Sequence, residues 1–343
     1  MRPPTPRSRR SRALLGTSVA VLLAAAAVVP AMAASQWNRS QNLDHAFVIM
    51  MENTGYDSLI GNSNAPWINQ AASMYGLATD YHGVTHPSQP NYIAAIAGST
   101  LGVADDSDHT VAAGSKSIVD QLESRGLTWA AYMQSYSLCS APTDSSCGNQ
   151  LYERKHNPFI SFPQVQASAA EQANIVDLSQ LSGDLASGQV ANFVWISPDQ
   201  CHDMHGRGAD ASDPCAYSNV QDLIATGDAF LQATVDEIMS SSVWASGHSA
   251  IFVTWDESDY TGSGPFGFGD TSGCCTANPG GGHVVTIVID NQGRAQGTLA
   301  TPTNHYSLLR TIQDAMHLGC LEATCERSQV PSLGHFVRGL PSH

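Results

Sequence analysis

The sequence predicts an α/β protein with a mostly parallel central sheet and helices on both faces. Residues 47–50 (FVIM) and 251–254 (IFVT) are unbroken apolar runs, the composition of strands that are buried on both sides of a parallel sheet. Segments with the apolar spacing of helices alternate with such runs along the chain. An alternation of strands and helices along the chain is typical of a parallel sheet that helices cover on both sides.

The remaining elements follow from similar patterns. Ser117 and Asp120 have the spacing of a capping box, which predicts a helix that ends near Arg125, before Gly126. Gly98 predicts the end of a short helix over 92–97. We expect further helices at 67–75, 220–239 and 306–317, and strands at 129–133, 192–196, 250–255 and 284–289. The glycine-rich stretch 261–282 predicts a long loop.

Residues 1–33 have the features of a secretory signal peptide. Five arginines and no acidic residue lie in the first 12 residues, an apolar run over 13–29 follows, and Ala31-Met32-Ala33 matches a small-residue cleavage site. The apolar run is short for a membrane span, so we expect export without a stable membrane anchor. Ser8-Arg9-Arg10 is a weak twin-arginine signal, because the usual apolar residues do not follow the pair.

Residues 34–343 are expected to fold as a single domain, since about 310 residues suit one large α/β domain. The whole chain has 15 basic and 30 acidic residues. Residues 1–33 contain five of the basic residues and none of the acidic ones. The rest of the chain therefore has 10 basic and 30 acidic residues, a net charge of −20 with histidine neutral. A surface this acidic does not attract nucleic acid or an anionic membrane over long range.

All eight cysteines follow residue 33, and an even number in an exported chain predicts disulfides. Three pairs are near enough in sequence to close small loops: Cys139 with Cys147, Cys201 with Cys215, and Cys320 with Cys325. The adjacent Cys274 and Cys275 are harder to place. Spacing alone does not determine the connectivity, and no cysteine and histidine set has the spacing of a structural zinc site.

Acidic residues directly follow both apolar runs. Glu52 and Asn53 come after the first predicted strand, and Asp256 and Glu257 after the second. Carboxylates buried at strand ends cost desolvation and repulsion energy unless a cation compensates them. Because every candidate ligand offers oxygen, we expect a hard ion, Mg²⁺, Ca²⁺ or Mn²⁺, in preference to zinc. A pair of solvated carboxylates is the alternative interpretation.

Ser88 lies between Pro87 and Pro90 and leads into an apolar helix. The N-terminus of a helix has free backbone N–H groups that attract an anion, so this is a suitable seat for a phosphoryl group. An ordinary helix-capping serine is the alternative. The chain has no Gly-x-Ser-x-Gly elbow, which argues against a lipase-type serine hydrolase.

Two further charged segments stand out. Lys155, one of only two lysines, forms a positive island with Arg154 and His156 in an acidic chain. We interpret Lys155 and His156 as a phosphate-binding edge, with surface charge beside a turn as the alternative. Residues 105–109 (DDSDH) lack the spacing of a calcium loop and are expected to form a solvated acidic loop.

Six motifs, in this order, resemble the phosphoesterase family of secreted bacterial and fungal acid phosphatases and phospholipases C. They are 52–53 (EN), 85–92 (THPSQPNY), 154–159 (RKHNPF), 203–205 (DMH), 254–257 (TWDE) and 305–310 (HYSLLR). The resemblance covers about 44–318 and is strongest to the compact secreted bacterial acid phosphatases, mycobacterial ones that attack phosphoinositides included. It implies an alkaline-phosphatase-like fold and one phosphoesterase catalytic domain over 34–343.

The resemblance also implies roles for single residues. Ser88 matches the nucleophile that becomes phosphorylated, and its oxygen completes a metal site that is formed by Glu52, Asn53, Asp256 and Glu257. The helix residue Asn91 is expected to donate to a phosphate oxygen.

On the leaving-group side, Asp203 and His205 match an Asp-Met-His motif. His205, with a pKa near neutrality, is expected to protonate the leaving group. Asp199 and His202 stand where close relatives often carry asparagine. Either residue could add a metal ligand, so one-metal and two-metal sites both stay open.

The implied function is a secreted metal-dependent acid phosphatase that hydrolyses phosphate monoesters, phosphoinositides among them, through a phosphoserine intermediate. Two alternatives are a phospholipase C-like phosphodiesterase that acts on a phospholipid headgroup and an inactive protein that binds phosphorylated ligands. The lack of an evident lipid-binding domain favours the monoesterase. The complete set of Glu52, Ser88, Asp256 and Glu257 argues against an inactive protein.

Overall fold

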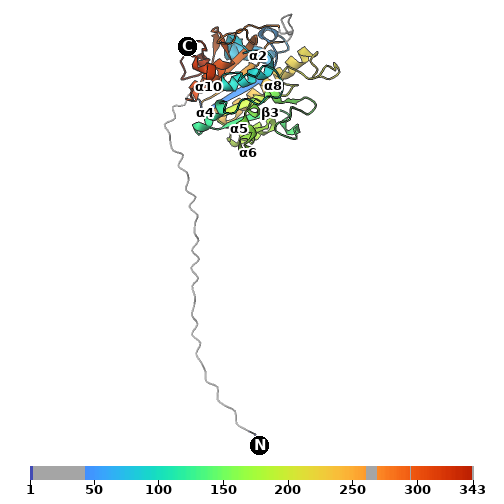
Figure 1. The fold of residues 1–343 in the computed structure, drawn as a ribbon, viewed down its shortest axis with the longest axis vertical. Coiled ribbons are helices and arrows are strands. Elements are labelled where there is room, and N and C mark those ends of the chain that lie inside the picture. The colour runs from blue at the N-terminus through green and yellow to red at the C-terminus, as the bar shows by residue number, and fades with distance from the viewer. Residues whose placement is uncertain (3–42, 260–268, 294, 342–343) are drawn as a thin grey trace. The chain divides into compact units, whose positions relative to one another are not determined.

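The computed structural model describes residues 1–2, 43–259, 269–293 and 295–341 (Figure 1). The part of the chain from Gln41 to His343 forms one compact unit. Most of the predicted signal peptide and residues 261–268 of the predicted loop lie outside the described residues. Within the described ranges, no helix has the length and apolar character that crossing a membrane requires.

One sheet of nine described strands forms the centre of this unit, in the order β10-β2-β9-β8-β1-β7-β3-β6, with β11 also paired to β2. β9 runs antiparallel to both of its neighbours, and the other described pairs of this sheet are parallel. The predicted mostly parallel sheet is therefore confirmed. Its strands are β1 (His45–Met51), β2 (Gly76–His82), β3 (Trp129–Met133), β6 (Ile175–Asp177), β7 (Phe193–Ser197), β8 (Ser249–Trp255), β9 (His283–Asp290), β10 (Gly297–Leu299) and β11 (Thr303–Asn304).

Helices of different lengths and a small second sheet complete the unit. The second sheet pairs β4 (Ser146–Cys147) with β5 (Tyr152–Glu153). The α-helices are α1 (Tyr56–Leu59), α2 (Pro66–Met74), α3 (Ser88–Ala97), α4 (Ile118–Ser124), α5 (Pro163–Gln166), α6 (Ala169–Gln172), α7 (Leu181–Ser187), α8 (Val220–Ser240), α9 (Ser242–Ser246) and α10 (His305–Ala315). The 3-10 helices are η1 (Tyr136–Leu138), η2 (Arg154–His156), η3 (Pro158–Ser161), η4 (Leu178–Gln180), η6 (Glu322–Cys325) and η7 (Gly334–Phe336).

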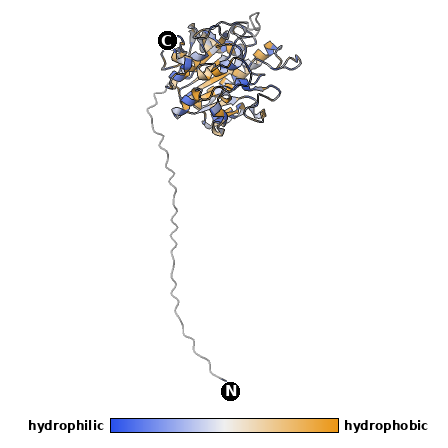
Figure 2. Cartoon of the chain, in the orientation of Figure 1, coloured by the Kyte–Doolittle hydropathy of each residue, from blue (hydrophilic) through white to orange (hydrophobic). Residues whose placement is uncertain are grey.

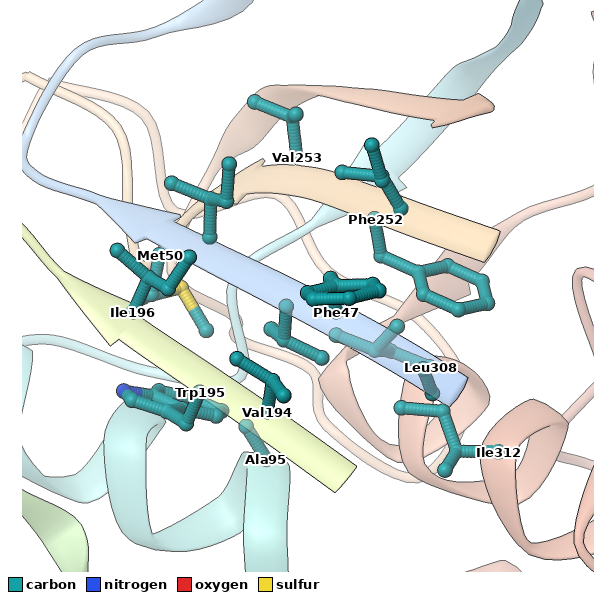
Figure 3. Close-up of a cluster of buried hydrophobic side chains, with 14 of the residues drawn as sticks. Phe47, Met50, Ala95, Val194, Trp195, Ile196, Phe252, Val253, Leu308 and Ile312 are labelled. Atoms are coloured by element: carbon teal, nitrogen blue, oxygen red, sulfur yellow. The ribbon is translucent and has the colours of Figure 1, made fainter. Parts of the chain in front are cut away.

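Both faces of the central strands are buried, as their apolar sequences require. Every residue of β7 and β8 is buried, and so is every residue of β1 after His45. Figure 3 shows Phe47 of β1 in one apolar cluster with Ala95 of α3 and Leu308 of α10. α2 and α8 pack against each other. Figure 2 shows the apolar segments gathered around the sheet at the centre of the unit.

The predicted elements agree well with the observed ones. The strand predicted at 129–133 has the bounds of β3, and the helix predicted at 220–239 is α8. The capping box forms as expected, since Ser117 accepts from the Val119 N–H and Asp120 accepts from the Ser117 N–H. Gly98 ends α3 with a φ of 73°, a left-handed conformation that glycine adopts without strain.

The sequence pattern does not predict β2, the strand that pairs with β9 on the side away from β8. Gly76, Asp80 and His82 interrupt its apolar residues, and its pairing with β9 shifts register between Ala78 and Tyr81. A strand with this composition is recognisable only once its partners are in place, because strand propensity depends strongly on neighbouring strands.

The disulfide predictions are confirmed for all three loops, Cys139–Cys147, Cys201–Cys215 and Cys320–Cys325. The two cysteines that could not be placed form a fourth bond, between the neighbours Cys274 and Cys275. Asp144 lies with Cys139 and Cys147 within 4.8 Å, a distance that suits a metal site. The two sulfur atoms are bonded to each other, however, so they offer no thiolate to a metal.

His305, the first residue of α10, connects this helix to two strands of the sheet. The ring is fully buried, and its Nε2 donates to the Asp256 carbonyl oxygen just after β8, at 2.6 Å. Its Nδ1 accepts from the Tyr81 hydroxyl of β2 at 3.0 Å. Burial lowers the pKa of His305 to about 4, so the ring is neutral at neutral pH.

We predict that His305 destabilises the folded chain as the pH falls. Its pKa is about 4 when folded and 6.5 ordinarily, so the unfolded chain binds the proton first. Stability that is present above pH 6.5 is then lost towards pH 4, by about 2 kcal/mol between pH 6.5 and 4.5. His305→Gln should flatten this fall in the free energy of unfolding, measured by urea denaturation. The control variant His335→Gln, at a partly exposed position, should keep the wild-type slope. An unchanged slope in His305→Gln would contradict the prediction.

Candidate active site

The candidate active site lies at the carboxyl ends of β1 and β8. Met51 and Trp255 are paired in register across these parallel strands, and the Asp256 N–H donates to the Met51 carbonyl oxygen at 3.0 Å. Glu52 and Asp256 therefore follow neighbouring strands at the same edge of the sheet. The side chains of both residues are fully buried. Ligands bind at this edge in open α/β sheets.

Ser88, the first residue of α3, brings its hydroxyl into the middle of this acidic set. Its Oγ lies 3.0 Å from Glu52 Oε2, 3.1 Å from Glu257 Oε1 and 3.3 Å from Asn53 Oδ1. A hydroxyl has one hydrogen to donate, so at most one of these three oxygens receives it. The structure thus brings the predicted nucleophile and predicted metal ligands together in a site with an excess of acceptors.

The same residues fit a divalent cation. Asp256 Oδ1 accepts from the Asn53 N–H at 3.0 Å, but Asp256 Oδ2 is buried without a hydrogen-bond partner among the described residues. Burial and the charges of Glu52 and Glu257 raise the pKa of Asp256 above its usual range. A cation would satisfy the orphaned oxygen and offset this repulsion. Since Glu52, Asn53, Ser88, Asp256 and Glu257 offer only oxygen, a hard ion suits them best.

Basic side chains face the carboxylates from two directions. His156 of η2 places its Nε2 3.1 Å from Glu52 Oε1 and its Nδ1 3.7 Å from Asp203 Oδ2. On the other side, the His86 ring contacts both the Glu257 carboxylate and the Asp270 carbonyl oxygen. Burial lowers the pKa of His86, but the Glu257 carboxylate outweighs this effect and raises it overall. Glu52, Asp203 and Glu257 therefore each have a histidine as a neighbour.

Glu52 and Lys155 stabilise the charged form of each other. Burial alone would raise the pKa of Glu52, but His156 and Lys155 hold it well below its usual range. Burial alone would lower the pKa of Lys155. The charges of Glu52 and Asp106 outweigh burial, however, and raise the pKa of Lys155 above its ordinary value. Glu52 is therefore ionised and Lys155 protonated in the folded chain. This supports the interpretation of Lys155 as a cationic edge of the site.

The Asp203-Met204-His205 motif joins the site through its backbone. The Glu52 N–H donates to the Asp203 carbonyl oxygen at 2.9 Å, and the His205 N–H donates to Asp203 Oδ1 at 2.8 Å. His205 Nδ1 donates to the Gly206 carbonyl oxygen at 2.7 Å, which leaves Nε2 to exchange a proton. Burial and the nearby Lys155 lower the pKa of His205 to about 4, below the near-neutral value expected from the motif.

Four rings form a row from the interior to the surface beside this motif. Tyr92 of α3 stacks on His156 with ring centres 5.2 Å apart, and His156 lies 6.4 Å from His205 in an edge contact. His205 in turn meets the edge of Tyr217 at 5.3 Å. Tyr92 is buried, whereas Tyr217 is 46% exposed. His205 therefore lies on the solvent side of the site, where a departing group would leave.

Asn91 does not have the free donor expected of a phosphate contact. Its Nδ2 donates to the carbonyl oxygens of Thr85 and Pro87, at 2.7 and 3.1 Å. Its Oδ1 accepts from the N–H groups of Val84 and Thr85, at 2.7 and 3.1 Å. Both amide hydrogens are engaged, so this geometry assigns Asn91 to holding the turn before Ser88.

Asp199 and His202 form a separate pair. His202 Nδ1 lies 2.6 Å from Asp199 Oδ1, and Asp199 Oδ2 accepts from the Ser135 hydroxyl at 2.7 Å. The Cys201 N–H also donates to Asp199 Oδ1, at 3.2 Å. The contacts described for these two side chains connect them to one another, to Ser135 and Cys201, and to the ring of Phe230. The acceptor-rich set around Ser88 is thus the one that fits an ion.

Two residues of the site were not predicted. His86 lies two residues before Ser88 in the same motif, so its position could have suggested a role beside the serine. Asp106 contacts Lys155 from a loop that sequence patterns describe only as acidic and solvated. Its contact joins residues 49 positions apart, and no local spacing signals such a pair.

Three relatives share parts of this sequence. A probable acid phosphatase of Kluyveromyces lactis is 31% identical over 46% of this chain and 38% of its own length. An acid phosphatase of Aspergillus fumigatus is 27% identical over 46% of this chain and 36% of its own length. A phosphatidylinositol-3-phosphatase of Mycobacterium tuberculosis is 27% identical over 75% of this chain and 77% of its own length. The matches to the two fungal proteins thus span well under half of those proteins.

Solved structures share the fold. A protein of the alkaline phosphatase superfamily from Vibrio parahaemolyticus is 11% identical with a TM-score of 0.52, covering 86% of this chain and 72% of its own. The phosphonate monoester hydrolase of Agrobacterium radiobacter is 13% identical with a TM-score of 0.53, covering 80% and 74%. These likenesses confirm the predicted alkaline-phosphatase-like fold. The Phosphoesterase family model matches residues 62–319, three quarters of the sequence, and the chain belongs to that family.

Proposed function

We propose that this protein is a metal-dependent acid phosphatase that hydrolyses phosphate monoesters through a phosphoserine on Ser88. The observation that carries the proposal is the Ser88 hydroxyl, held 3.0 to 3.3 Å from oxygens of Glu52, Glu257 and Asn53. Relatives named acid phosphatase and phosphatidylinositol-3-phosphatase support a monoester substrate. Phosphoinositides are accordingly among the substrates to be tested.

The metal ion in this proposal is held by Glu52, Asn53, Ser88, Asp256 and Glu257. When bound, such an ion lowers the pKa of a serine hydroxyl and bears part of the negative charge on a phosphoryl group. The buried Asp256 Oδ2, which has no hydrogen-bond partner among the described residues, supports this assignment.

The protein's own side chains divide the remaining work. The Ser88 hydroxyl releases its proton to solvent and takes one up again when the phosphoserine is hydrolysed. Ser88 Oγ attacks phosphorus, the bond from phosphorus to the leaving oxygen breaks, and Lys155 and His156 balance charge on the phosphoryl oxygens. His205 Nε2 donates a proton to the leaving oxygen, with Asp203 fixing the backbone of His205. Water then attacks the phosphoserine and His205 accepts its proton, so free phosphate and Ser88 are regenerated. A pKa of about 4 makes protonated His205 available in acidic solution.

Secretion is a further part of the proposal. It is supported by the signal-peptide features of residues 1–33 and by four disulfides, bonds that persist in oxidising surroundings outside the cytoplasm. We propose that residues 34–343 act as a single phosphoesterase catalytic domain. The net charge of −20 without the leader arginines supports a soluble phosphorylated substrate in preference to an anionic membrane surface.

We predict that Ser88→Ala abolishes turnover, because the attacking oxygen is lost. The value of kcat/KM for p-nitrophenyl phosphate should fall by at least about a thousandfold. The matched control is Ser73→Ala, an exposed serine of α2 whose hydroxyl bonds only to its own helix, which should retain full activity. Wild-type activity in Ser88→Ala would refute the serine mechanism. Release of choline phosphate from phosphatidylcholine without inorganic phosphate would instead identify a phosphodiesterase.

Metal dependence is tested by removal and return of the ion. Dialysis against EDTA should abolish activity, because the carboxylates around Ser88 are then left uncompensated. Mg²⁺, Ca²⁺ or Mn²⁺ should restore activity better than Zn²⁺, since the ligand atoms are all oxygen. The measurement is the initial rate of phosphate release, with thermal melting as the check that the stripped protein stays folded. Full activity after chelation would exclude the proposed ion.

A further inference from the structure

The acidic loop at residues 105–109 is attached to the candidate active site, although Asp105, Ser107 and Asp108 are exposed, as expected of a solvated loop. Asp108 Oδ1 lies 3.2 Å from Arg154 Nη1, and the Arg154 guanidinium also donates to the His109 carbonyl oxygen at 2.9 Å. Asp106 forms an ion pair with Lys155 at 3.1 Å. The loop is solvated as expected, but two of its residues also contact the positive island that lies almost fifty residues later in the chain.

Asp106 uses its two carboxylate oxygens to connect two parts of the site. Oδ1 accepts from the Gln89 N–H at 2.9 Å, and Oδ2 accepts from Lys155 Nζ at 3.1 Å. Gln89 follows Ser88 in α3, so one carboxylate joins the helix of the nucleophile to the cationic edge. With its amide turned to satisfy both ends, the Gln89 side chain also donates to the Ser107 carbonyl oxygen at 2.6 Å. The loop is therefore fixed to α3 at two points.

This arrangement changes how the site can bind an anion. The N-terminus of α3 was expected to offer free N–H groups to a phosphoryl group, but Asp106 already takes the Gln89 N–H, and Pro90 has none. The negative charge of the substrate must then be balanced mainly by side chains. Lys155 forms an ion pair with Asp106, and the charges of the buried Glu52 and Asp256 also act on it. The position of its ammonium group decides whether it meets a phosphate or pairs with the buried acids.

We propose that Asp106 is a positioning residue that holds Lys155 toward the phosphoryl group of the substrate, an inference that rests on the proposed phosphatase function. A lysine side chain has a flexible stem and a single charged end, so a second partner is needed to fix it. Asp106 supplies that partner through its ion pair with the Lys155 ammonium group at 3.1 Å. Without Asp106, the attraction of Glu52 and Asp256 draws the ammonium group inward, away from the substrate.

The test uses Asp106→Asn in the full-length, metal-loaded enzyme, assayed with p-nitrophenyl phosphate and with inorganic phosphate as the inhibitor. We expect KM and the inhibition constant of phosphate to rise about 5- to 20-fold, while kcat changes less than about 3-fold. In a Lys155→Met background, Asp106→Asn should cause no further rise, because the side chain that it positions is absent. The matched control is Asp108→Asn, on the same loop but paired with Arg154, which should leave both constants near the wild-type values.

A second variant separates position from charge. Asp106→Glu keeps the charge but is longer by one methylene group, so it should also raise the inhibition constant of phosphate. This variant replaces Asp106→Asn if the latter melts below the assay temperature.

The outcomes distinguish this inference from the proposed function. If wild-type enzyme is inactive or Ser88→Ala retains activity, the proposed function fails first. If the wild type is active but Asp106→Asn leaves both constants unchanged, Asp106 does not position Lys155. Tighter phosphate binding by Asp106→Asn would overturn the inference, because it would show that Asp106 acts mainly by repelling the substrate. An equal effect of Asp106→Asn with and without Lys155 would overturn it too.

Discussion

The candidate active site depends on the burial of four carboxyl groups beside a single hydroxyl. Glu52, Asp203, Asp256 and Glu257 are all fully buried, and acids this close cannot all ionise without compensating charge. The basic neighbours at positions 86, 155 and 156 supply part of that compensation. The acceptor-rich space around Ser88 requires the rest, and this is the physical reason for expecting an ion there.

The fold brings these groups together because a parallel sheet ends all its strands at one edge. β1 and β8 are neighbours in space although about two hundred residues separate them, and their register places Glu52 beside Asp256. α3 then directs Ser88 onto the same edge, and η2 adds the basic residues. His305 supports this arrangement, because its ring donates a buried hydrogen bond to the Asp256 carbonyl oxygen. A shift of register by one residue would separate the serine from its acids.

The sequence was sufficient to predict the parallel sheet and the longest helices from local patterns, and the set of residues around Ser88 from such patterns together with the family resemblance. Apolar runs specify buried strands wherever they lie, and the acids that follow them must share an edge. β2 and the contact between Asp106 and Lys155 could not be predicted, because both depend on partners distant in the chain. The pKa of His205 depends in the same way on burial and on Lys155, neither of which is visible in the motif itself.

The motif at residues 85–92 shows that residues which identify a family need not all act on its substrate. Ser88 faces the acids, whereas Asn91 uses both amide hydrogens to hold the preceding turn, and Gln89 anchors the loop of Asp106. A buried polar side chain whose hydrogen bonds are all made to the backbone cannot bind substrate without breaking one of them, which costs about 1 to 3 kcal/mol. The supporting residues are therefore constrained by the shape of the turn. In the proposed mechanism, the chemistry is assigned instead to Ser88, the acids around it and Lys155.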